Sequence, residues 1–255
     1  MACITNDANR YWRLGVVPFT IERTSWPVSV RASAVAAIRA AIADWEANTT
    51  LRFIERTDEI DFVTFTKEVD GVDLTRANAC YSIQRLIGPI PWTAAIGRVG
   101  GQQFIICLQD TLFTSIMIHE IGHAVGFYHE QQRSDRDSFV SVTGVEAANT
   151  LNNGIPGDGQ NVGTYDCTSV MHYTTRPGLA VATGGCAAGT LGTNTVTAAG
   201  EIAATDLMYL GQSISAEQVL RGCMGRAGDL TLKEHTDASG GSLRRALIRL
   251  ERQFC

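Results

Sequence analysis

The sequence lacks long apolar runs and has little positive charge. Its longest apolar stretches, such as FIICL at 104–108, are far shorter than the ~20 residues that a helix needs to span a bilayer. Lys67 and Lys233 are the only lysines, and the net charge is −5. An acidic balance gives no electrostatic basis for binding nucleic acid or an anionic membrane. We therefore expect neither of these partners.

The sequence also lacks a visible signal peptide and C-x-x-C pairs of cysteines. Residues 1–15 have neither a basic start nor an apolar run, so no signal peptide is visible, and we expect an exported chain to be the mature form. The seven cysteines form no C-x-x-C pair, which argues against a structural zinc ribbon. Their wide scatter favours disulfides and a secreted or extracytoplasmic protein. Because seven is odd, at least one cysteine is free, binds metal or pairs with another chain.

What the sequence does contain is the pattern of a globular protein with helices and strands. Its 255 residues are 45% hydrophobic, enough to bury the core of one large domain or two small ones. Ile38, Ile42 and Trp45 recur at three- and four-residue steps, which predicts a helix over 30–48. Pro18 suits an edge strand or a strand start. Further helices are expected at 112–125 and about 200–210, and strands at 16–22, 51–56, 61–66 and 102–108.

Two regions show little periodicity. Residues 67–103 are rich in glycine and proline and are expected to be mostly loop. Residues 131–200 are rich in Gly, Asn, Thr and Ser, so we expect irregular structure with one or two short helices. The last residues, 212–255, predict a tail with two helical stretches around ASGGS (238–242).

The most informative stretch is HEIGHAVGFYH at 119–129. His119 and His123 are four residues apart on a predicted helix, so their imidazoles share one face and can share one zinc ion. Gly126 stands where the helical pattern ends, and glycine there can turn the chain sharply. The turn would return His129 to the same metal as a third ligand. Three protein ligands leave zinc an open position for water, as in catalytic sites.

Glu120 lies next to the first histidine and can sit beside a zinc-bound water. A carboxylate there can accept a proton as water attacks a carbonyl and pass it to the leaving amine. The alternative is chance, because H-E-x-x-H alone fixes three positions and occurs in unrelated proteins. The longer H-E-x-x-H-x-x-G-x-x-H fixes five positions on a predicted helix and turn, and this context favours a metal site.

A second motif, SVMHY, follows at 169–173. Together with HEIGHAVGFYHEQQRSDRD (119–137), it resembles the astacin family of metzincin zinc endopeptidases. The family pattern F-x-H-E-x-x-R-x-D-R-D is complete over 127–137. Weaker similarity extends over about residues 3–210, and the tail lies outside it.

The resemblance implies one zinc ion per chain, bound by His119, His123 and His129. It implies that Glu120 is the general base and that Met171 forms the Met-turn, an apolar floor beneath the ligands. Tyr173 matches a tyrosine that ligates zinc at rest and then stabilises the transition state, and a phenol can do both. A packed aromatic is the alternative for Tyr173. His172 is expected to be a structural hydrogen-bonding residue.

Glu130 matches a glutamate that, in the family, contacts the buried amino terminus of the mature enzyme. Alignment of Trp12 and Pro18 with the family's mature start places that terminus near Ala2 or Cys3, so we expect a chain of about mature length without a propeptide. Residues added before Ala2 are expected to disturb the cleft, because a buried ammonium–carboxylate pair is costly to break on one side.

The resemblance also guides the cysteines and the loop after SVMHY. The expected pairs are Cys80–Cys107, Cys167–Cys186 and Cys223–Cys255. Cys3 is left over, either as an inert buried thiol, which residue chemistry favours, or as an inhibitory zinc ligand. The loop at 174–186 lacks the Phe-Ser that often follows the Met-turn in the family. It is expected to border the primed side of the cleft, where Arg176 either favours an acidic substrate residue or is solvated.

We therefore expect an α+β, metzincin-like fold of two subdomains. The upper one, about 1–128, holds a twisted mixed sheet and two long helices above the cleft; the lower one, about 129–211, is irregular and holds the Met-turn. Residues 212–255 form a helical tail outside this catalytic domain. The expected function is that of a secreted, monomeric zinc endopeptidase, whose protein or peptide substrates add an extended strand to an edge strand at about 102–108. The alternative is a zinc-loaded but silent homologue that acts as a binding protein; loss of Glu120 would have been its signature.

Overall fold

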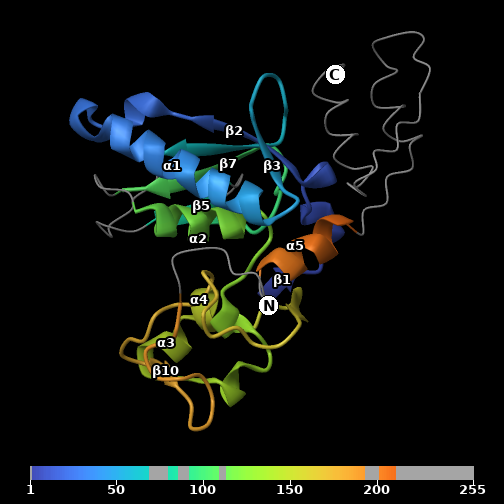
Figure 1. Ribbon diagram of the computed structural model, residues 1–255, viewed down its shortest axis with the longest axis vertical. Coiled ribbons are helices and arrows are strands. Elements are labelled where there is room, and N and C mark those ends of the chain that lie inside the picture. Colours follow the sequence, from blue (N-terminus) through green and yellow to red (C-terminus); the bar gives the residue numbers. More distant parts are fainter. Residues whose placement is uncertain (1, 69–79, 86–91, 109–112, 193–200, 211–255) are drawn as a thin grey trace. The chain divides into compact units, whose positions relative to one another are not determined.

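The computed structural model describes residues 2–68, 80–85, 92–108, 113–192 and 201–210 (Figure 1). The chain divides into two units, Met1–Gly211 and Gln212–Cys255, and every described residue belongs to the first. The predicted helical tail and the Cys223–Cys255 pair lie outside the described residues. Over the described part of the chain, no helix has both the length and the apolar character needed to cross a membrane.

A six-stranded mixed sheet has the strand order β3-β2-β4-β7-β5-β6. Four strands pair in parallel: β2 (Val16–Ile21), β3 (Arg52–Glu55), β4 (Phe62–Thr66) and β7 (Gln102–Cys107). Two pair antiparallel: β5 (Cys80–Arg85) and β6 (Trp92–Ala94). The parallel strands lie where they were predicted. The expectation that 67–103 is mostly loop misses β5 and β6. Gly88, Pro89 and Pro91 stand between these strands, where such residues mark a connection between strands as readily as a long loop.

Two predictions about the sheet edges are wrong. The strand expected at an edge, β7, lies between β4 and β5, so it is paired on both sides. β2 is also internal. The Phe19 carbonyl accepts the Arg56 N–H of the β3 side at 2.8 Å, so the preceding Pro18 nitrogen faces β4. Pairing with β4 begins only at Phe19, so the proline removes no ladder hydrogen bond. The edges of the sheet are β3 and β6.

Two helices pack against each other beside the sheet (Figure 1). α1 (Val28–Asn48) follows Pro27 and confirms the helix predicted at 30–48. α2 (Thr114–Ala124) confirms the helix predicted at 112–125. Trp45 is fully buried in α1, and its indole N–H donates to the Ile118 carbonyl of α2 at 3.0 Å. A buried indole therefore joins the two helices by packing and by one hydrogen bond.

The rest of the described chain consists of short elements, as predicted for 131–200. Antiparallel pairs form between β1 (Ala2–Thr5) and β9 (Gly159–Val162), and between β8 (Val140–Val142) and β10 (Leu179–Val181). The helices are α3 (Gly144–Ala148), α4 (Thr150–Asn153) and α5 (Glu201–Leu210). Single 3-10 turns occur at Ala8–Arg10, Arg13–Gly15, Arg23–Ser25, Glu130–Gln132 and Arg136–Ser138. β1 was not predicted, and it carries the start of the chain to a strand more than 150 residues away.

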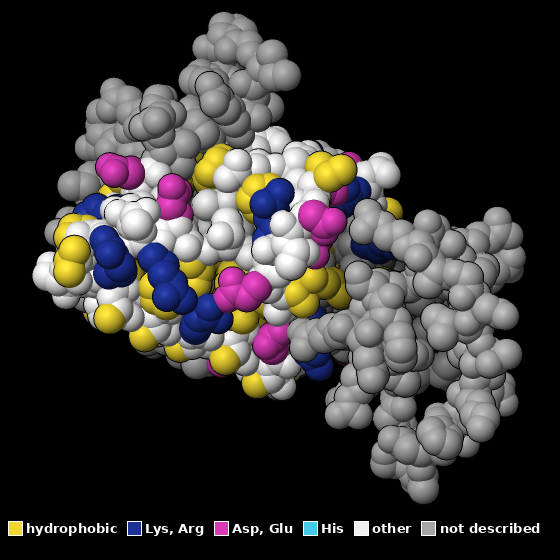
Figure 2. Space-filling model, turned by 90° about the horizontal axis from the view of Figure 1, so that it is seen from above, with side chains coloured by type: hydrophobic (Ala, Val, Ile, Leu, Met, Phe, Trp, Pro, Cys, Tyr) yellow, Lys and Arg dark blue, Asp and Glu magenta, His cyan; other side chains and the backbone are white. Residues whose placement is uncertain are grey.

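Two of the expected disulfides are confirmed, Cys80–Cys107 and Cys167–Cys186. Cys3 is free and only 1% exposed. Burial raises the pKa of its thiol to about 12, so the thiol stays protonated at neutral pH. Such a group is a small hydrophobe and not a reactive nucleophile, which agrees with the inert alternative. Figure 2 shows acidic, basic and apolar side chains interspersed over the described part of one face, without a large area of a single charge.

Candidate metal centre

α2 and the turn after it bring the three histidines of the motif together. The helix ends where the Gly126 N–H donates to the His123 carbonyl at 3.1 Å. Gly126 has a φ of +113°, which L side chains rarely adopt, and a Cβ there would lie 3.1 Å from the Met208 sulfur. Phe127 is fully buried and its ring lies 5.5 Å from that of Trp45. The turn predicted at Gly126 is therefore fixed by backbone conformation and by packing.

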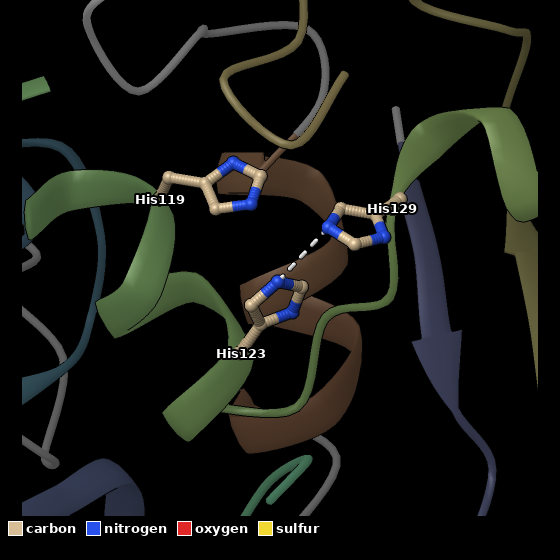
Figure 3. Close-up of side chains that lie close together, drawn as sticks. All are labelled: His119, His123 and His129. Carbon is tan, nitrogen blue, oxygen red and sulfur yellow. Dashed lines mark hydrogen bonds between the residues drawn. The ribbon is translucent and has the colours of Figure 1, made fainter. Parts of the chain in front are cut away.

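The imidazoles of His119, His123 and His129 converge, the first two from α2 and the third from the segment after the turn (Figure 3). One ring nitrogen from each lies within 4.8 Å of the others. The Nε2 atoms of His123 and His129 are 3.2 Å apart. Two nitrogens that bind zinc at ~2.0–2.1 Å in a tetrahedron are about 3.3 Å apart. The spacing of this pair therefore fits two ligands of one zinc ion.

Each imidazole is oriented by a backbone carbonyl. The Nδ1 atom of His119 lies 2.8 Å from the Val170 oxygen, that of His123 lies 2.8 Å from the Phe127 oxygen, and that of His129 lies 3.1 Å from the Asn152 oxygen. A carbonyl only accepts, so Nδ1 carries the proton in each ring and Nε2 keeps its lone pair. Metal-bound histidines in proteins are commonly oriented in this way.

Burial keeps these rings neutral. It lowers the pKa of all three imidazoles, and that of His123 to about 3. His123 and His129 are also lowered by the neighbouring rings, because two imidazolium charges would repel. His119 is half-buried and the other two are buried. Neutral imidazoles with free Nε2 lone pairs are the form that binds zinc, so the donor set fits this metal.

Glu120 projects from α2 between the first two histidines and is 6% exposed. Burial raises the pKa of its carboxyl to about 8, and a hydrogen bond from the backbone of Ser82 acts in the opposite direction. Ser82 lies on β5, and its carbonyl accepts the Ala95 N–H at 2.9 Å. The carboxylate therefore lies against β5 of the sheet.

Tyr173 lies against the histidines. Its ring is 4.3 Å from that of His129 and 6.1 Å from that of His119, measured between centroids. Burial and then the Glu120 charge raise the pKa of its phenol to about 12. The backbone N–H of Tyr173 donates to the Gln131 side chain at 3.1 Å. The aromatic expected at the metal thus lies beside two of the histidines, with its backbone held by the segment that follows His129.

Met171 and His172 have different surroundings. Met171 is fully buried, and a Cβ placed on Gly122 of α2 would lie 2.3 Å from its sulfur, so the methionine packs directly under the helix of the metal cluster. His172 shares a hydrogen bond of 2.6 Å with the Tyr165 hydroxyl, and its Nδ1 lies 2.6 Å from the Tyr173 carbonyl. Among the described residues, the metal-binding group does not include His172, in agreement with its expected structural role.

Glu130 is fully buried. One carboxylate oxygen accepts the Asp166 N–H at 2.8 Å and lies 3.7 Å from Arg133 Nε, while the other has no hydrogen-bond partner in the described part of the chain. Burial raises the pKa of this carboxyl to about 8, and the charge of the amino terminus is among the influences that lower it. An unpartnered buried oxygen near β1 is what the predicted contact with an ammonium group requires.

Arg176 is paired and partly exposed. Its guanidinium pairs with Glu146, with nitrogen–oxygen distances of 2.8 and 3.0 Å, and lies 3.9 Å from the centre of the Tyr173 ring. Its side chain is 36% exposed. The contact between Arg176 and an acidic substrate residue stays a prediction. It would involve a guanidinium that already pairs with Glu146.

Sequence analysis missed several residues of the site. Gln132 accepts the His129 N–H at 2.9 Å, a capping-box contact that its position three residues after a helix start would have indicated. Gln131 holds Tyr173 and is fully buried. Asn152 acts through its backbone carbonyl and Glu146 through a contact 30 residues away, so no local pattern indicates either one.

Comparison with known proteins places this geometry in a family. The sequence model of the astacin peptidase family matches residues 4–180. Bone morphogenetic protein 1 of Xenopus laevis is 32% identical over 174 residues, 66% of this chain and 21% of that protein. High choriolytic enzyme 2 of Oryzias latipes is 35% identical over 143 residues, 54% of this chain and 43% of that protein. The chain thus spans less than half the length of these relatives.

A solved structure has the same fold. High choriolytic enzyme 1, a hatching enzyme zinc-protease from Oryzias latipes, matches with a TM-score of 0.58 at 24% identity, over 80% of this chain and 96% of that one. The three-histidine cluster is the metal site typical of zinc binding in astacins. The chain belongs to the astacin family of zinc metalloendopeptidases.

Proposed function

We propose that this chain is a zinc-dependent endopeptidase that hydrolyses internal peptide bonds of proteins, with one zinc ion bound by His119, His123 and His129. The observation that carries the proposal is the set of three neutral imidazoles, each with Nδ1 turned to a carbonyl and Nε2 turned to a shared point. A structural zinc site would supply a fourth protein ligand. Among the described His, Cys, Asp and Glu residues, only these three form the cluster.

Glu120 is the proposed general base. The three histidines would hold a zinc ion, which would supply a Lewis acid for acidifying water and polarising a peptide carbonyl. Glu120 accepts the proton of the attacking water and delivers it to the leaving amine. Its place on α2, between two of the ligands and next to Ser82 of β5, supports this role.

Tyr173 and Met171 complete the proposed site. Tyr173 is the proposed metal ligand at rest and the donor to the oxyanion during the reaction; its ring contacts with two of the histidines support this. Met171, which packs under Gly122, is proposed as the Met-turn. Glu130 is proposed to bind the amino-terminal ammonium of the mature enzyme through its unpartnered oxygen.

Substrate is proposed to bind as an extended strand on the β5–β6 side of the sheet, in place of the β7 edge expected from the sequence. Ser82 of β5 contacts Glu120, so a peptide added along this side would run past the carboxylate. Main-chain pairing of this kind accepts many side chains, which suits protein substrates.

The domain division also stays a proposal. Residues 1–211 are proposed as the catalytic domain, with upper and lower subdomains of about 1–128 and 129–211, and 212–255 as a tail of unknown role. The two disulfides and the family suit an extracellular protein, and we propose that it is secreted. The monomeric state expected from the sequence also stays a proposal.

The direct test is cleavage of casein by the zinc-loaded protein, with and without a chelator. Chelation should abolish cleavage and added zinc should restore it. Glu120→Ala should keep its zinc, as measured by metal analysis, and lose activity by ~100-fold or more, the range for a general base. Glu22→Gln, a change at an exposed glutamate in the upper half, serves as the control and should keep full activity.

The alternative function, a zinc-bound but silent binding protein, predicts a different result. Wild-type protein with zinc fully bound would then cleave neither casein nor a mixed peptide library. That outcome would contradict the proposed peptidase activity but not the proposed zinc site.

A further inference from the structure

The Tyr173 ring is covered by an arginine that the metal site itself does not require. The guanidinium carbon of Arg176 lies 3.9 Å from the ring centroid. A cation at this distance over an aromatic face is attracted by the ring quadrupole. The Tyr173 ring therefore contacts both the histidine rings and an arginine, and its orientation depends on where Arg176 is held.

Glu146 holds that arginine. Arg176 Nη2 donates to Glu146 Oε2 at 3.0 Å, and Arg176 Nε lies 2.8 Å from Oε1 as an ion pair without a hydrogen bond. The Glu146 side chain is 16% exposed and that of Arg176 is 36% exposed. Two contacts with one carboxylate restrict the guanidinium more than a single contact does. The guanidinium restricted in this way is the one that covers the tyrosine.

Backbone hydrogen bonds hold the segments that carry Arg176 and Glu146. Arg176 begins a tight turn in which its N–H and carbonyl exchange hydrogen bonds with Leu179 at 3.0 and 2.9 Å. Pro177 and Gly178 are the central residues, and Gly178 has a φ of +86°, as such a turn requires. The Gly178 carbonyl accepts the N–H of Thr143, the residue before α3, at 2.8 Å. The turn that bears Arg176 is thus docked on the helix that bears Glu146.

Glu146 is also connected to the segment that orients His129, one of the proposed metal ligands. Asn153 Nδ2 donates to Glu146 Oε2 at 2.7 Å and to the Glu146 carbonyl at 3.0 Å. The neighbouring Asn152 carbonyl orients the His129 ring. Glu146 therefore joins the segment that orients a histidine to the side chain that covers Tyr173.

We propose that Arg176 and Glu146 act as one positioning unit, a clamp that sets the Tyr173 phenol beside the three histidines. This rests on the proposed catalytic role of Tyr173. Arg176 also has a side-chain hydrogen bond with Tyr173, but in this proposal it touches neither the substrate nor the metal. It limits the positions that the phenol can take when it leaves the metal and turns to the oxyanion. A misplaced catalytic group is costly, since a displacement of ~1 Å can reduce the rate about 100-fold.

Arg176→Lys is the informative change. Lysine keeps the positive charge but can neither make both contacts with Glu146 nor lie flat on the ring. Glu146→Gln breaks the clamp from the other side, and the double variant tests whether the two residues act as a unit. Arg56→Lys is the matched control, because Arg56 also lies 3.9 Å from an aromatic centroid, that of Phe62, on the β3–β4 side of the sheet.

The measurements are kcat and KM for two peptide substrates that differ only in having a neutral or an acidic residue after the cleaved bond. We expect kcat to fall about tenfold for both substrates in each single variant, below the ~100-fold limit for a misplaced group. KM should stay unchanged, and the double variant should be no worse than either single variant. Arg56→Lys should match the wild type.

A second readout does not depend on activity. With Cu²⁺ in place of zinc, a metal-bound phenolate gives a charge-transfer absorption, which Tyr173→Phe should remove. Arg176→Lys and Glu146→Gln should shift or weaken this band, while the Arg56→Lys band should equal that of the wild type. Thermal melting of each variant verifies that it is folded.

The outcomes separate the two proposals. If Tyr173→Phe loses activity but Arg176→Lys keeps the wild-type kcat and copper band, the clamp is refuted and the role of Tyr173 stands. If Arg176→Lys raises KM for the acidic substrate alone, Arg176 is a recognition residue and the clamp is again refuted. If Tyr173→Phe changes neither activity nor spectrum, the role of Tyr173 fails and the clamp fails with it.

Discussion

Gly122 is the residue on which the contact between α2 and the lower part of the site depends. It lies in the middle of the motif, yet it binds nothing and was given no role from the sequence. An added Cβ would lie 2.3 Å from the Met171 sulfur and 3.4 Å from Trp45 Cζ2. Both neighbours are fully buried and have no room to move. The helix therefore carries a glycine here because the methionine needs the space.

Gly122→Ala is expected to lower the free energy of unfolding by up to about 2 kcal/mol, the ~1–3 kcal/mol cost of overpacking less the ~1 kcal/mol that alanine gains over glycine in a helix. Urea unfolding of the zinc-loaded protein measures it. Gly157→Ala is the control, because a Cβ there meets nothing within 4 Å and Gly157 has no positive φ. Equal stability of the two variants would contradict the packing argument.

Residue spacing accounts for what the sequence could predict of the site. His119, His123 and His129 follow from helix periodicity and one glycine turn, both of which are local. The carbonyls that orient these rings and the side chains that hold Tyr173 come from distant segments, and a carbonyl belongs to every residue type. No sequence pattern distinguishes Asn152 or Val170 from its neighbours, so these contacts appear only in the folded chain.

At the scale of elements, the long helices and the parallel strands were predicted because several turns or alternations repeat in each. β1 and β9 have four residues each and are paired across the length of the domain, so neither offers a repeat to detect. The order of strands is also hidden, because a buried strand has the same composition wherever it stands in the sheet. This is why the edge was placed at β7.

Arg133 ties β1 and β9 to the segment after the metal site, and this explains the part of RSDRD that chemistry alone did not. Its side chain is 1% exposed. It donates to the carbonyls of Ala2, Val162 and Gly163 at 3.3, 3.0 and 2.8 Å. It also forms a two-point pair with Asp135, at 2.9 and 2.8 Å. The Arg133 guanidinium therefore adds hydrogen bonds to a strand pair that has only four residues on each side.

The Arg133–Asp135 pair predicts how stability depends on pH. The hydrogen bond from Arg133 lowers the pKa of Asp135 below its usual value. The Asp135 carboxylate therefore stabilises the folded state fully above its unfolded pKa of ~3.9. This stabilisation is lost as the pH falls through the lower pKa that Asp135 has in the folded state. Asp135→Asn should cost about 1 kcal/mol at neutral pH, a figure reduced for the 41% exposure of the side chain. The difference in free energy of unfolding between Asp135→Asn and the wild type, here called the gap, should narrow below about pH 4.

Denaturant unfolding of both proteins at a series of pH values measures this gap, and the comparison cancels groups that both proteins share. Asp137→Asn is the control, since Asp137 is 85% exposed and pairs with Arg136 at 3.4 Å; it should leave stability unchanged at every pH. A gap for Asp135→Asn that stays constant down to about pH 2–3, well below the unfolded pKa, would show that its charge does not stabilise the β1–β9 pair.

At the scale of the whole domain, the metal cluster joins segments that lie far apart in the sequence. α2 supplies two imidazoles, the segment after Gly126 supplies the third, and the carbonyls of Val170 and Asn152 fix their rings. A ligand that binds only the folded chain stabilises it by RT ln(1 + [L]/Kd), about 2.7 kcal/mol at 100 times Kd. Zinc is therefore expected to raise the Tm of the domain, and a chelator to lower it.

The difference in Tm between zinc-loaded and chelated protein, by calorimetry at constant pH, isolates this effect from other causes of instability. His129→Ala removes one ligand and should abolish most of the difference. His172→Gln changes a buried histidine, 4% exposed, that bonds to Tyr165. It should lower both Tm values and leave their difference intact, because His172 supports the fold and not the metal. Equal differences in the two variants would mean that metal-dependent stability does not arise from the three-histidine cluster.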